Sequence, residues 1–126
     1  MRREYSIKEN RDFRRVYRYG KSKVDSNLVV YVAKSNNKNS RVGFSVSKKV
    51  GNAVIRNKIK RRLREIFRKN VFNFKNTFDV VVVARKAAAN ADYHMLEKSF
   101  LKHLESLNVI DCDIRRWKSC VKFYCN

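Results

Sequence analysis

The chain has 126 residues, which suits a single domain that buries about two-thirds of its unfolded surface in one core. Its 31 Lys and Arg residues outnumber 11 Asp and Glu, giving a formal net charge of +20, far more than solubility requires. Such a density of like charge weakens the folded state, so we expect a polyanionic partner. No apolar run reaches about 18 residues, so we expect nothing that spans a bilayer.

Nucleic acid is the commonest polyanion for such a chain, and an anionic membrane surface is the alternative. The first ten residues, MRREYSIKEN, contain no apolar segment, so we expect no signal peptide. Three cysteines without a signal peptide favour a reducing cytoplasm, and their spacing matches no common zinc motif. These cysteines are Cys112, Cys120 and Cys125.

The first predicted element is a helix that ends near Tyr19. Residues 6–9, SIKE, have the pattern of a capping box, with Ser6 as the N-cap and Glu9 reaching back to it. Gly20 then provides a helix stop. One face of this helix carries Phe13, Val16 and Tyr17 at helical spacing.

Two strands are predicted next, at 27–34 (NLVVYVAK) and 41–47 (RVGFSVS), separated by a polar turn. A further short strand is expected near Lys23–Val24. In the 41–47 strand the core-facing residues are Val42, Phe44 and Val46. The expected outward residues are Arg41, Gly43, Ser45 and Ser47. Because three of these four are small, we expect them to form the floor of a groove.

Residues 51–70 predict a second helix that carries eight cations and one carboxylate, Glu65. Its apolar arc comprises Ile55, Ile59, Leu63, Ile66 and Phe67. The opposite arc comprises Asn57, Lys60, Arg61, Arg64 and Arg68. The cations therefore form a stripe, although like charges at this spacing destabilise a helix.

Residues 77–84 are apolar on both faces, as in a central strand covered on both sides. A third helix is predicted over 92–107, with a buried stripe of Tyr93, Leu96, Phe100, Leu104 and Leu107. The order helix, strands, helix, strand, helix predicts one α+β layer sandwich. We expect a domain over residues 1–107 and a tail of unknown structure over 108–126.

The basic helix is either a solvated charged face or a phosphate-binding surface. On a solvated helix face, positive and negative side chains usually alternate. The charges on this face are almost all positive, so phosphate binding is favoured. Lys48, Lys49 and Asn52 lie at its start, where free backbone N–H groups and the helix dipole also attract anions. A membrane-surface helix would usually carry Trp or Phe on its apolar face, whereas this face is mostly Ile and Leu.

The aromatics Phe13, Tyr17 and Tyr31 are candidates for either core packing or base stacking. Arg14, Arg15, Arg18 and Lys21 surround the first two, and aromatic rings among cations bind single-stranded nucleic acid. An enzyme active site is weakly indicated, since no nucleophile, metal or paired-carboxylate motif stands out. His94 and His103 are far from any obvious acid partner for catalysis, and we expect His103 on the solvated side of its helix.

The segment RVGFSVSKKVGNAVIRNKIKRRLREIF (41–67) closely resembles the signature region of the bacterial ribonuclease P protein subunit. The resemblance extends to DFRRVYRYG (12–20) and VVVVARKAA (80–88). It implies an α/β sandwich of α+β class, with a central mixed β-sheet, three helices, and a ribosomal-protein-like topology with a left-handed βαβ crossover. It also implies a cytoplasmic protein that pairs with a catalytic RNA to remove the 5′ leader from precursor tRNA.

The same resemblance implies two RNA-binding sites and no catalytic residue on this chain. The leader would bind a cleft with Phe13, Tyr17 and Tyr31, and the small outward residues Ser45 and Ser47 would add its floor. The catalytic RNA would bind Lys48, Lys49, Asn52, Arg56, Asn57, Lys58, Lys60, Arg61, Arg64 and Arg68. The family's Arg-Asn-Arg motif has Lys at its third position here, Lys58, which keeps the charge but lacks the forked geometry of Arg.

The implied cofactor is Mg²⁺, bound mainly by the RNA, with a possible ion site near Asn57 that the RNA shares. The implied partners are the catalytic RNA and precursor tRNA, with no membrane and no protein partner inferred. Two other hypotheses are a ribosomal protein of similar fold and a basic nuclease that cleaves without an RNA subunit.

Overall fold

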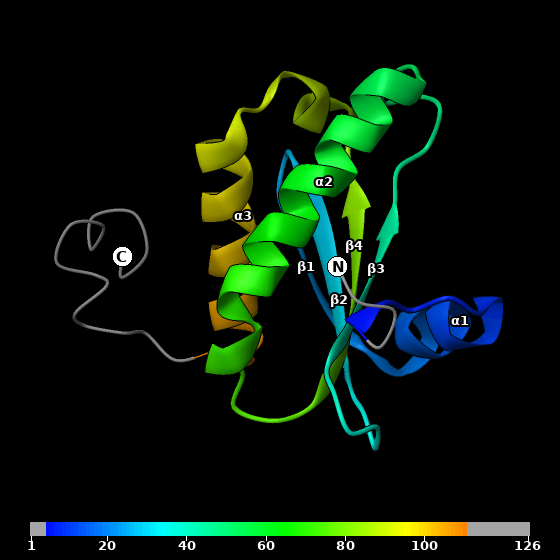
Figure 1. Ribbon diagram of the computed structural model, residues 1–126, viewed down its shortest axis with the longest axis vertical. Helices are drawn as coiled ribbons and strands as arrows, with labels where there is room; N and C mark the ends of the chain where they lie inside the picture. The colour runs from blue at the N-terminus through cyan, green and yellow to red at the C-terminus, as the bar shows by residue number, and fades with distance from the viewer. Residues whose placement is uncertain (1–4, 111–126) are drawn as a thin grey trace, which may run out of the picture.

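The computed structural model describes residues 5–110, which form one α+β unit of three α-helices around a four-stranded sheet (Figure 1). Its elements in chain order are α1 (Asn10–Tyr19), β1 (Lys21–Val24), β2 (Leu28–Lys34), β3 (Arg41–Ser45), α2 (Ala53–Asn70), the 3₁₀-helix η2 (Val71–Asn73), β4 (Phe78–Ala84), the 3₁₀-helix η3 (Lys86–Asn90) and α3 (Tyr93–Ser106). The predicted order of helices and strands is confirmed, including the short strand β1. None of the helices within residues 5–110 combines the length and the apolar character needed to cross a bilayer.

The sheet is mixed, with strand order β1-β2-β4-β3. Strands β1, β2 and β4 are antiparallel neighbours, whereas β3 pairs with β4 in parallel and forms an edge. With β3 and β4 pointing up and α2 in front of them, β4 lies to the left of β3, so the β3-α2-β4 crossover is left-handed (Figure 1). Roughly 98% of such connections are right-handed, so this expected feature is an unusual one.

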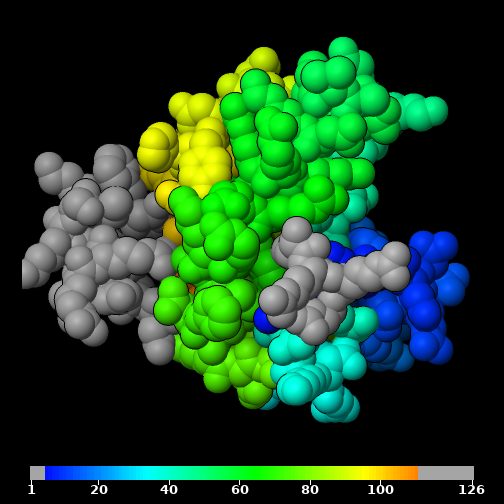
Figure 2. All heavy atoms as spheres, in the orientation of Figure 1, coloured from blue at the N-terminus to red at the C-terminus, as the bar shows by residue number. Residues whose placement is uncertain are grey.

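One face of the sheet packs against α2 and α3, which lie side by side (Figures 1 and 2). Val30, Val80 and Val82 line this face of the central strands and are fully buried. The predicted apolar arc of α2 packs there, with Ile59, Leu63, Ile66 and Phe67 buried and Ile55 partly buried. The main core therefore lies between the sheet and this pair of helices.

The opposite face of the sheet packs against α1 through a smaller cluster centred on Val16, Ala33 and Val81. Val16 is the one buried residue of α1. The cover is incomplete, because Val24 on β1 remains 58% exposed. A small apolar contact thus leaves much of this face open beside the helix.

The start of α1 differs from the predicted capping box. Ser6 pairs instead with Val42 at the edge of β3, and the Ile7 N–H donates to the Val42 carbonyl at 3.0 Å. The N-cap is Glu9, which makes no side-chain cap hydrogen bond. Backbone pairing with an unprotected edge strand therefore outcompetes the local capping pattern.

Gly20 ends α1 as predicted, but for a different reason. Its backbone is extended rather than left-handed, and its N–H donates to the Val16 carbonyl at 2.8 Å. A Cβ at this position would approach the Val32 carbonyl oxygen to 2.8 Å. Close approach of α1 to β2 therefore requires glycine here.

The prediction that His103 lies on the solvated side of α3 is wrong. Only 4% of the residue is exposed, and its Nε2 lies 3.3 Å from Oδ2 of Asp25 in the β1–β2 turn. The same carboxylate accepts hydrogen bonds from the Ser99 hydroxyl and from the backbone N–H groups of Asn27 and Leu28. Long-range packing of this turn onto α3 supplies the acidic partner that local sequence did not reveal.

The packed domain extends beyond the predicted end at residue 107. Val109 and Ile110 are buried in the main core. Val109 accepts a backbone hydrogen bond from Lys75 at 2.8 Å, and Ile110 pairs with Phe74. The three cysteines and the rest of the tail lie outside the described residues.

The Asp25–His103 contact predicts a loss of stability in mild acid. Burial lowers the pKa of His103 below its usual 6.5, an effect that the Asp25 carboxylate only partly offsets. The unfolded chain therefore binds the proton more readily, and the free energy of unfolding should fall as pH drops below about 6.5, by at most about 1.4 kcal/mol per pH unit.

Denaturant titrations between about pH 6.5 and 5 should show this slope, and His103→Gln should flatten it. Burial opposes ionisation of Asp25, but hydrogen bonds from Ser99, Leu28 and Asn27 hold its pKa below 3.8, so its own contribution is lost only at lower pH. The matched control is His94→Gln, on the exposed side of the same helix, which should keep the slope. An identical slope in the wild type and in His103→Gln would contradict the assignment.

Candidate nucleic-acid interface

The ten residues predicted to bind the catalytic RNA lie on α2 and on the turn that precedes it. The side chain of Asn52 caps α2 by accepting a hydrogen bond from the Ile55 N–H at 3.0 Å. Of these ten residues, the ones on α2 that are exposed to solvent are Asn57, Lys58, Arg61, Arg64 and Arg68, whereas Arg56 and Lys60 are half-buried. The predicted stripe is therefore present as a continuous cationic surface.

Arg62 and Arg68 of α2 make hydrogen bonds within the domain. Arg62 donates to the Ala91 carbonyl at 3.0 Å, which joins α2 to the segment before α3. Arg68 pairs with Glu65 one turn earlier, and the hydrogen bond from Arg68 lowers the pKa of that carboxyl. Arg62 therefore has a structural role, and Glu65 offsets part of the charge at the C-terminal end of the helix. The exposed cations of α2 are Lys58, Arg61, Arg64, Arg68 and Lys69, so the positive charge extends along most of the helix.

An aromatic hollow of about 510 Å³ lies between α1 and β3. Its lining comprises Asn10, Phe13, Arg14, Tyr17, Phe44 and Ser45. The four α1 residues are spaced at i, i+3, i+4 and i+7, which places them on one helical face. Tyr31 of β2 adjoins the hollow, because its ring meets the ring of Tyr17 edge-on at 4.9 Å.

The structure thus brings together four of the five residues predicted for the leader cleft. Ser47 lies apart, in a hollow of about 370 Å³ that also includes Lys49, Arg85 and Lys86. Gly43 does not form an open floor, because a Cβ there would meet the Phe13 ring at 2.5 Å. The open floor beneath α1 therefore begins at Ser45.

Tyr17 presents a neutral, partly exposed phenol ring to the hollow. Burial raises the pKa of its phenol, although a hydrogen bond with Ser45 partly opposes this. The side chain is still 40% exposed, so part of the ring faces the hollow. A neutral ring that is half-buried offers a stacking surface without repelling phosphate.

Phe44 is a site residue that sequence reasoning assigned only to the core. It packs against the main core, yet its ring also lines the aromatic hollow. On its other side the guanidinium carbon of Arg64 lies 5.7 Å from the ring centroid, in a cation–π contact. The aromatic hollow and the cationic surface of α2 therefore meet at the edge strand β3.

A buried carboxylate, Asp79 of β4, fixes α1 against the sheet. Arg41 of β3 donates to both of its oxygens, with Nε–Oδ1 at 3.0 Å and Nη2–Oδ2 at 2.9 Å. Arg15 of α1 donates to Oδ2 from the helix side, and Asp12 lies 3.5 Å from Arg41. In the sequence, Asp79 is a lone acidic residue next to a run of valines. This pattern could have indicated a buried ion pair, because a buried charge requires partners.

The described residues do not form a metal centre on their own. No group of three His, Cys, Asp or Glu side chains within residues 5–110 could hold an ion. Near Asn57 the chain offers an amide oxygen among cations, whereas Mg²⁺ prefers several oxygen ligands. A magnesium ion there would need most of its ligands from another molecule.

A cationic helix beside an aromatic hollow, on an α+β sandwich with a left-handed crossover, is the arrangement of a nucleic-acid-binding protein. The ribonuclease P family model matches residues 1–108. The ribonuclease P protein component of Clostridium novyi is 48% identical over 101 residues, which cover 79% of this chain and 89% of that protein. The component from Listeria monocytogenes is 43% identical over 106 residues, covering 83% and 89%.

Solved structures agree with these sequence relationships. The Staphylococcus aureus RNase P protein superposes with a TM-score of 0.78 at 38% identity, covering 85% of this chain and 98% of that one. The Thermotoga maritima RNase P protein, solved with 1-(4-fluorophenyl)-2-thiourea, gives a TM-score of 0.69 at 35% identity, covering 80% and 95%. The chain belongs to the ribonuclease P protein family, and it is the protein subunit that works with the ribonuclease P RNA in tRNA 5′-leader processing.

The Asp79 contacts predict a large cost for losing this carboxylate. Asp79→Asn would leave Arg15 and Arg41 without their buried counter-charge and should lower the free energy of unfolding by about 3 kcal/mol. The control is Arg11→Gln, which breaks the exposed Glu9–Arg11 pair at 2.7 Å and should cost less than about 1 kcal/mol. Equal costs in denaturant titrations would show that the network does not hold α1.

Proposed function

We propose that the aromatic hollow binds the single-stranded leader of precursor tRNA while the cationic surface of α2 binds the catalytic RNA. The observation that carries this proposal is the meeting of the two surfaces at Phe44, which lines the hollow and contacts Arg64. A protein with both surfaces at one edge can hold a substrate strand against the RNA that cuts it. The cations also screen phosphate repulsion between the two RNAs.

In the leader site, Phe13, Tyr17 and Tyr31 supply stacking surfaces, and Ser45 supplies a hydroxyl at the floor. Arg14 at the rim is placed to contact phosphate. Leaders differ in sequence, so stacking combined with phosphate contact suits them better than readout of base edges. Each stacked base contributes about 1–3 kcal/mol to binding.

On α2, exposed Lys58, Arg61 and Arg64 contact the backbone of the folded catalytic RNA, which proteins recognise chiefly by shape and phosphate position. Lys58 donates as a point charge, whereas the two arginines can fork onto two phosphate oxygens. Mg²⁺ is bound mainly by RNA, with the Asn57 amide as a shared ligand, and the RNA carries out the cleavage. This assembly works in the cytoplasm.

A reconstitution assay tests the proposal. Precursor tRNA is incubated at near-physiological magnesium with the protein, with the catalytic RNA, and with both. We expect strong cleavage only with both. Cleavage by the protein alone would favour a free-standing nuclease, and no stimulation of the RNA would favour a different ribonucleoprotein, such as the ribosome.

Paired variants test the division between the two surfaces. Phe13→Ala with Tyr17→Ala should weaken holoenzyme binding to precursor tRNA by roughly tenfold or more and leave mature tRNA binding unchanged, because only the precursor carries a leader. Arg61→Ala with Arg64→Ala should instead weaken binding of the catalytic RNA. The log–log salt dependence of that binding should flatten by roughly 0.7–0.9 for each phosphate group that the variant no longer neutralises.

Each pair of variants serves as the control for the other. Equal losses for precursor and mature tRNA in the aromatic variant would remove the leader assignment. An unchanged salt slope in the arginine variant would remove the assignment of α2 to the catalytic RNA.

A further inference from the structure

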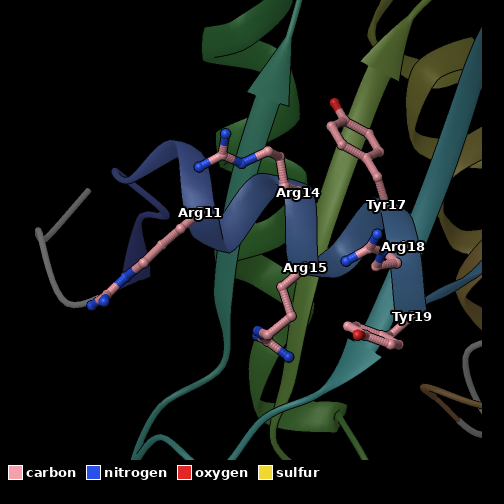
Figure 3. Close-up of a pocket in the computed structure, with 6 residues that line it drawn as sticks. All are labelled: Arg11, Arg14, Arg15, Tyr17, Arg18 and Tyr19. Carbon is pink, nitrogen blue, oxygen red and sulfur yellow. The ribbon is translucent and has the colours of Figure 1, made fainter.

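Helix α1 presents two adjacent functional faces, of which the leader site uses one. Arg11, Arg15, Arg18 and Tyr19 lie on the next face, at i, i+4, i+7 and i+8. In Figure 3, Arg14 and Tyr17 extend to one side of the helix, whereas Arg15 and Tyr19 extend to the other. A hollow of about 590 Å³ along α1 includes residues of both faces and shares Arg14 and Tyr17 with the aromatic hollow.

This α1 hollow continues into a larger basic hollow of about 750 Å³, with which it shares Arg15 and Tyr19. The basic hollow lies where β1 begins and β2 ends, and its wall includes Lys21, Lys34 and Lys75. Among the described residues, no carboxylate lines it. Three neighbouring hollows thus share lining residues, from the leader site, along α1, to the basic hollow.

Side chains of the basic hollow divide into those that build its wall and those that face solvent. Arg15 is held by Asp79 and by the Lys34 carbonyl at 3.3 Å, and Lys75 donates to Asn108 at 3.3 Å. Lys21, Lys34 and Tyr19 are exposed, with Tyr19 at 73%. An exposed ring between lysines, next to the cation of Arg18 at 6.0 Å, is the arrangement that binds unpaired bases and phosphate.

The ligand of the basic hollow is inferred from its positive charge and from the lining residues that link it to the leader site. A cation would be repelled by the lysines. A membrane would need an exposed apolar surface, whereas Val32, Ala33 and Phe78 in this wall are buried, at most 8% exposed. A single RNA strand that leaves the aromatic hollow would meet rings and cations in alternation along α1. We propose that the basic hollow binds the distal part of a long precursor-tRNA leader, with Tyr19 stacking on a base and Lys21 and Lys34 contacting phosphate.

This inference rests on the proposed function, because the strand enters from the leader site. It predicts that binding strength depends on leader length. Short leaders fill the aromatic hollow alone, and long ones also reach the basic hollow. The longer leader should therefore bind the holoenzyme more tightly.

The test measures dissociation constants of the reconstituted holoenzyme for precursors with leaders of about 4 and about 16 nucleotides, which bracket the site sizes of single-strand binding domains. Lys21→Gln with Lys34→Gln should weaken long-leader binding by roughly tenfold and flatten its salt slope by roughly 1.4, with short-leader binding unchanged. Tyr19→Ala should weaken long-leader binding by a similar factor, and Tyr19→Phe should restore it.

The matched control for charge is Lys98→Gln with Lys102→Gln on exposed positions of α3, which should leave both leaders unaffected. Equal loss in this control would mean that net charge alone matters and would overturn the proposal. Equal loss for both leaders in the Lys21 and Lys34 variant would also overturn it, since the hollow would then serve the catalytic RNA or the fold. Absence of any advantage for the long leader in the wild type would overturn it as well.

The same measurements distinguish an error in the leader-site assignment from an error in the basic-hollow assignment. Phe13→Ala with Tyr17→Ala should weaken binding of the short leader, whereas the Lys21 and Lys34 variant should not. If the aromatic variant leaves short-leader binding intact, the proposed function fails. If only the length dependence is missing, the basic hollow alone is rejected.

Discussion

The functional face of this protein depends on one buried charge, the carboxylate of Asp79. It lies in the central strand β4 with no solvent exposure, and an isolated charge at such a position would cost several kcal/mol. Arg41 and Arg15 neutralise it from β3 and α1. Val16 and the partly buried Phe13 add apolar packing to this electrostatic contact, and together they set how the helix sits on the sheet.

The setting of α1 in turn arranges the surfaces on either side of it. Arg15 points at Asp79. As a result, the neighbouring face of α1 places Phe13 and Tyr17 in the aromatic hollow beside β3. The next face carries Tyr19 toward the start of β1. This buried contact therefore helps to orient the aromatic side chains on both faces of α1.

Several acidic residues of this chain make contacts that stabilise its own fold. Asp79 holds α1, Asp25 joins the β1–β2 turn to α3, and Asp92 caps α3 through the Met95 N–H at 2.9 Å. Glu65 pairs with Arg68 on α2. Because 31 Lys and Arg residues face only 11 Asp and Glu, most cations lack an acidic counterpart of their own, so binding to phosphate is what relieves their mutual repulsion.

The edge position of β3 is the second constraint on function. The left-handed crossover carries the chain from β3 through α2 to the neighbouring strand β4, so α2 lies over the same edge. At an edge, residues from both faces of a strand can reach the surface. Phe44 consequently belongs to the core, to the aromatic hollow and to the contact with Arg64 at once.

The sequence by itself determined the elements, the α+β class, the cationic stripe of α2 and the aromatic residues of α1, because these follow from periodicity and charge along a short segment. Its resemblance to a known family indicated the function, which the family match and the relatives then supported. Tertiary structure alone decided what depends on contacts between distant segments. Asp79 with Arg15, Asp25 with His103, Ser6 with β3, and Phe44 with Arg64 each join residues at least 20 positions apart, and no local pattern specifies such a pair.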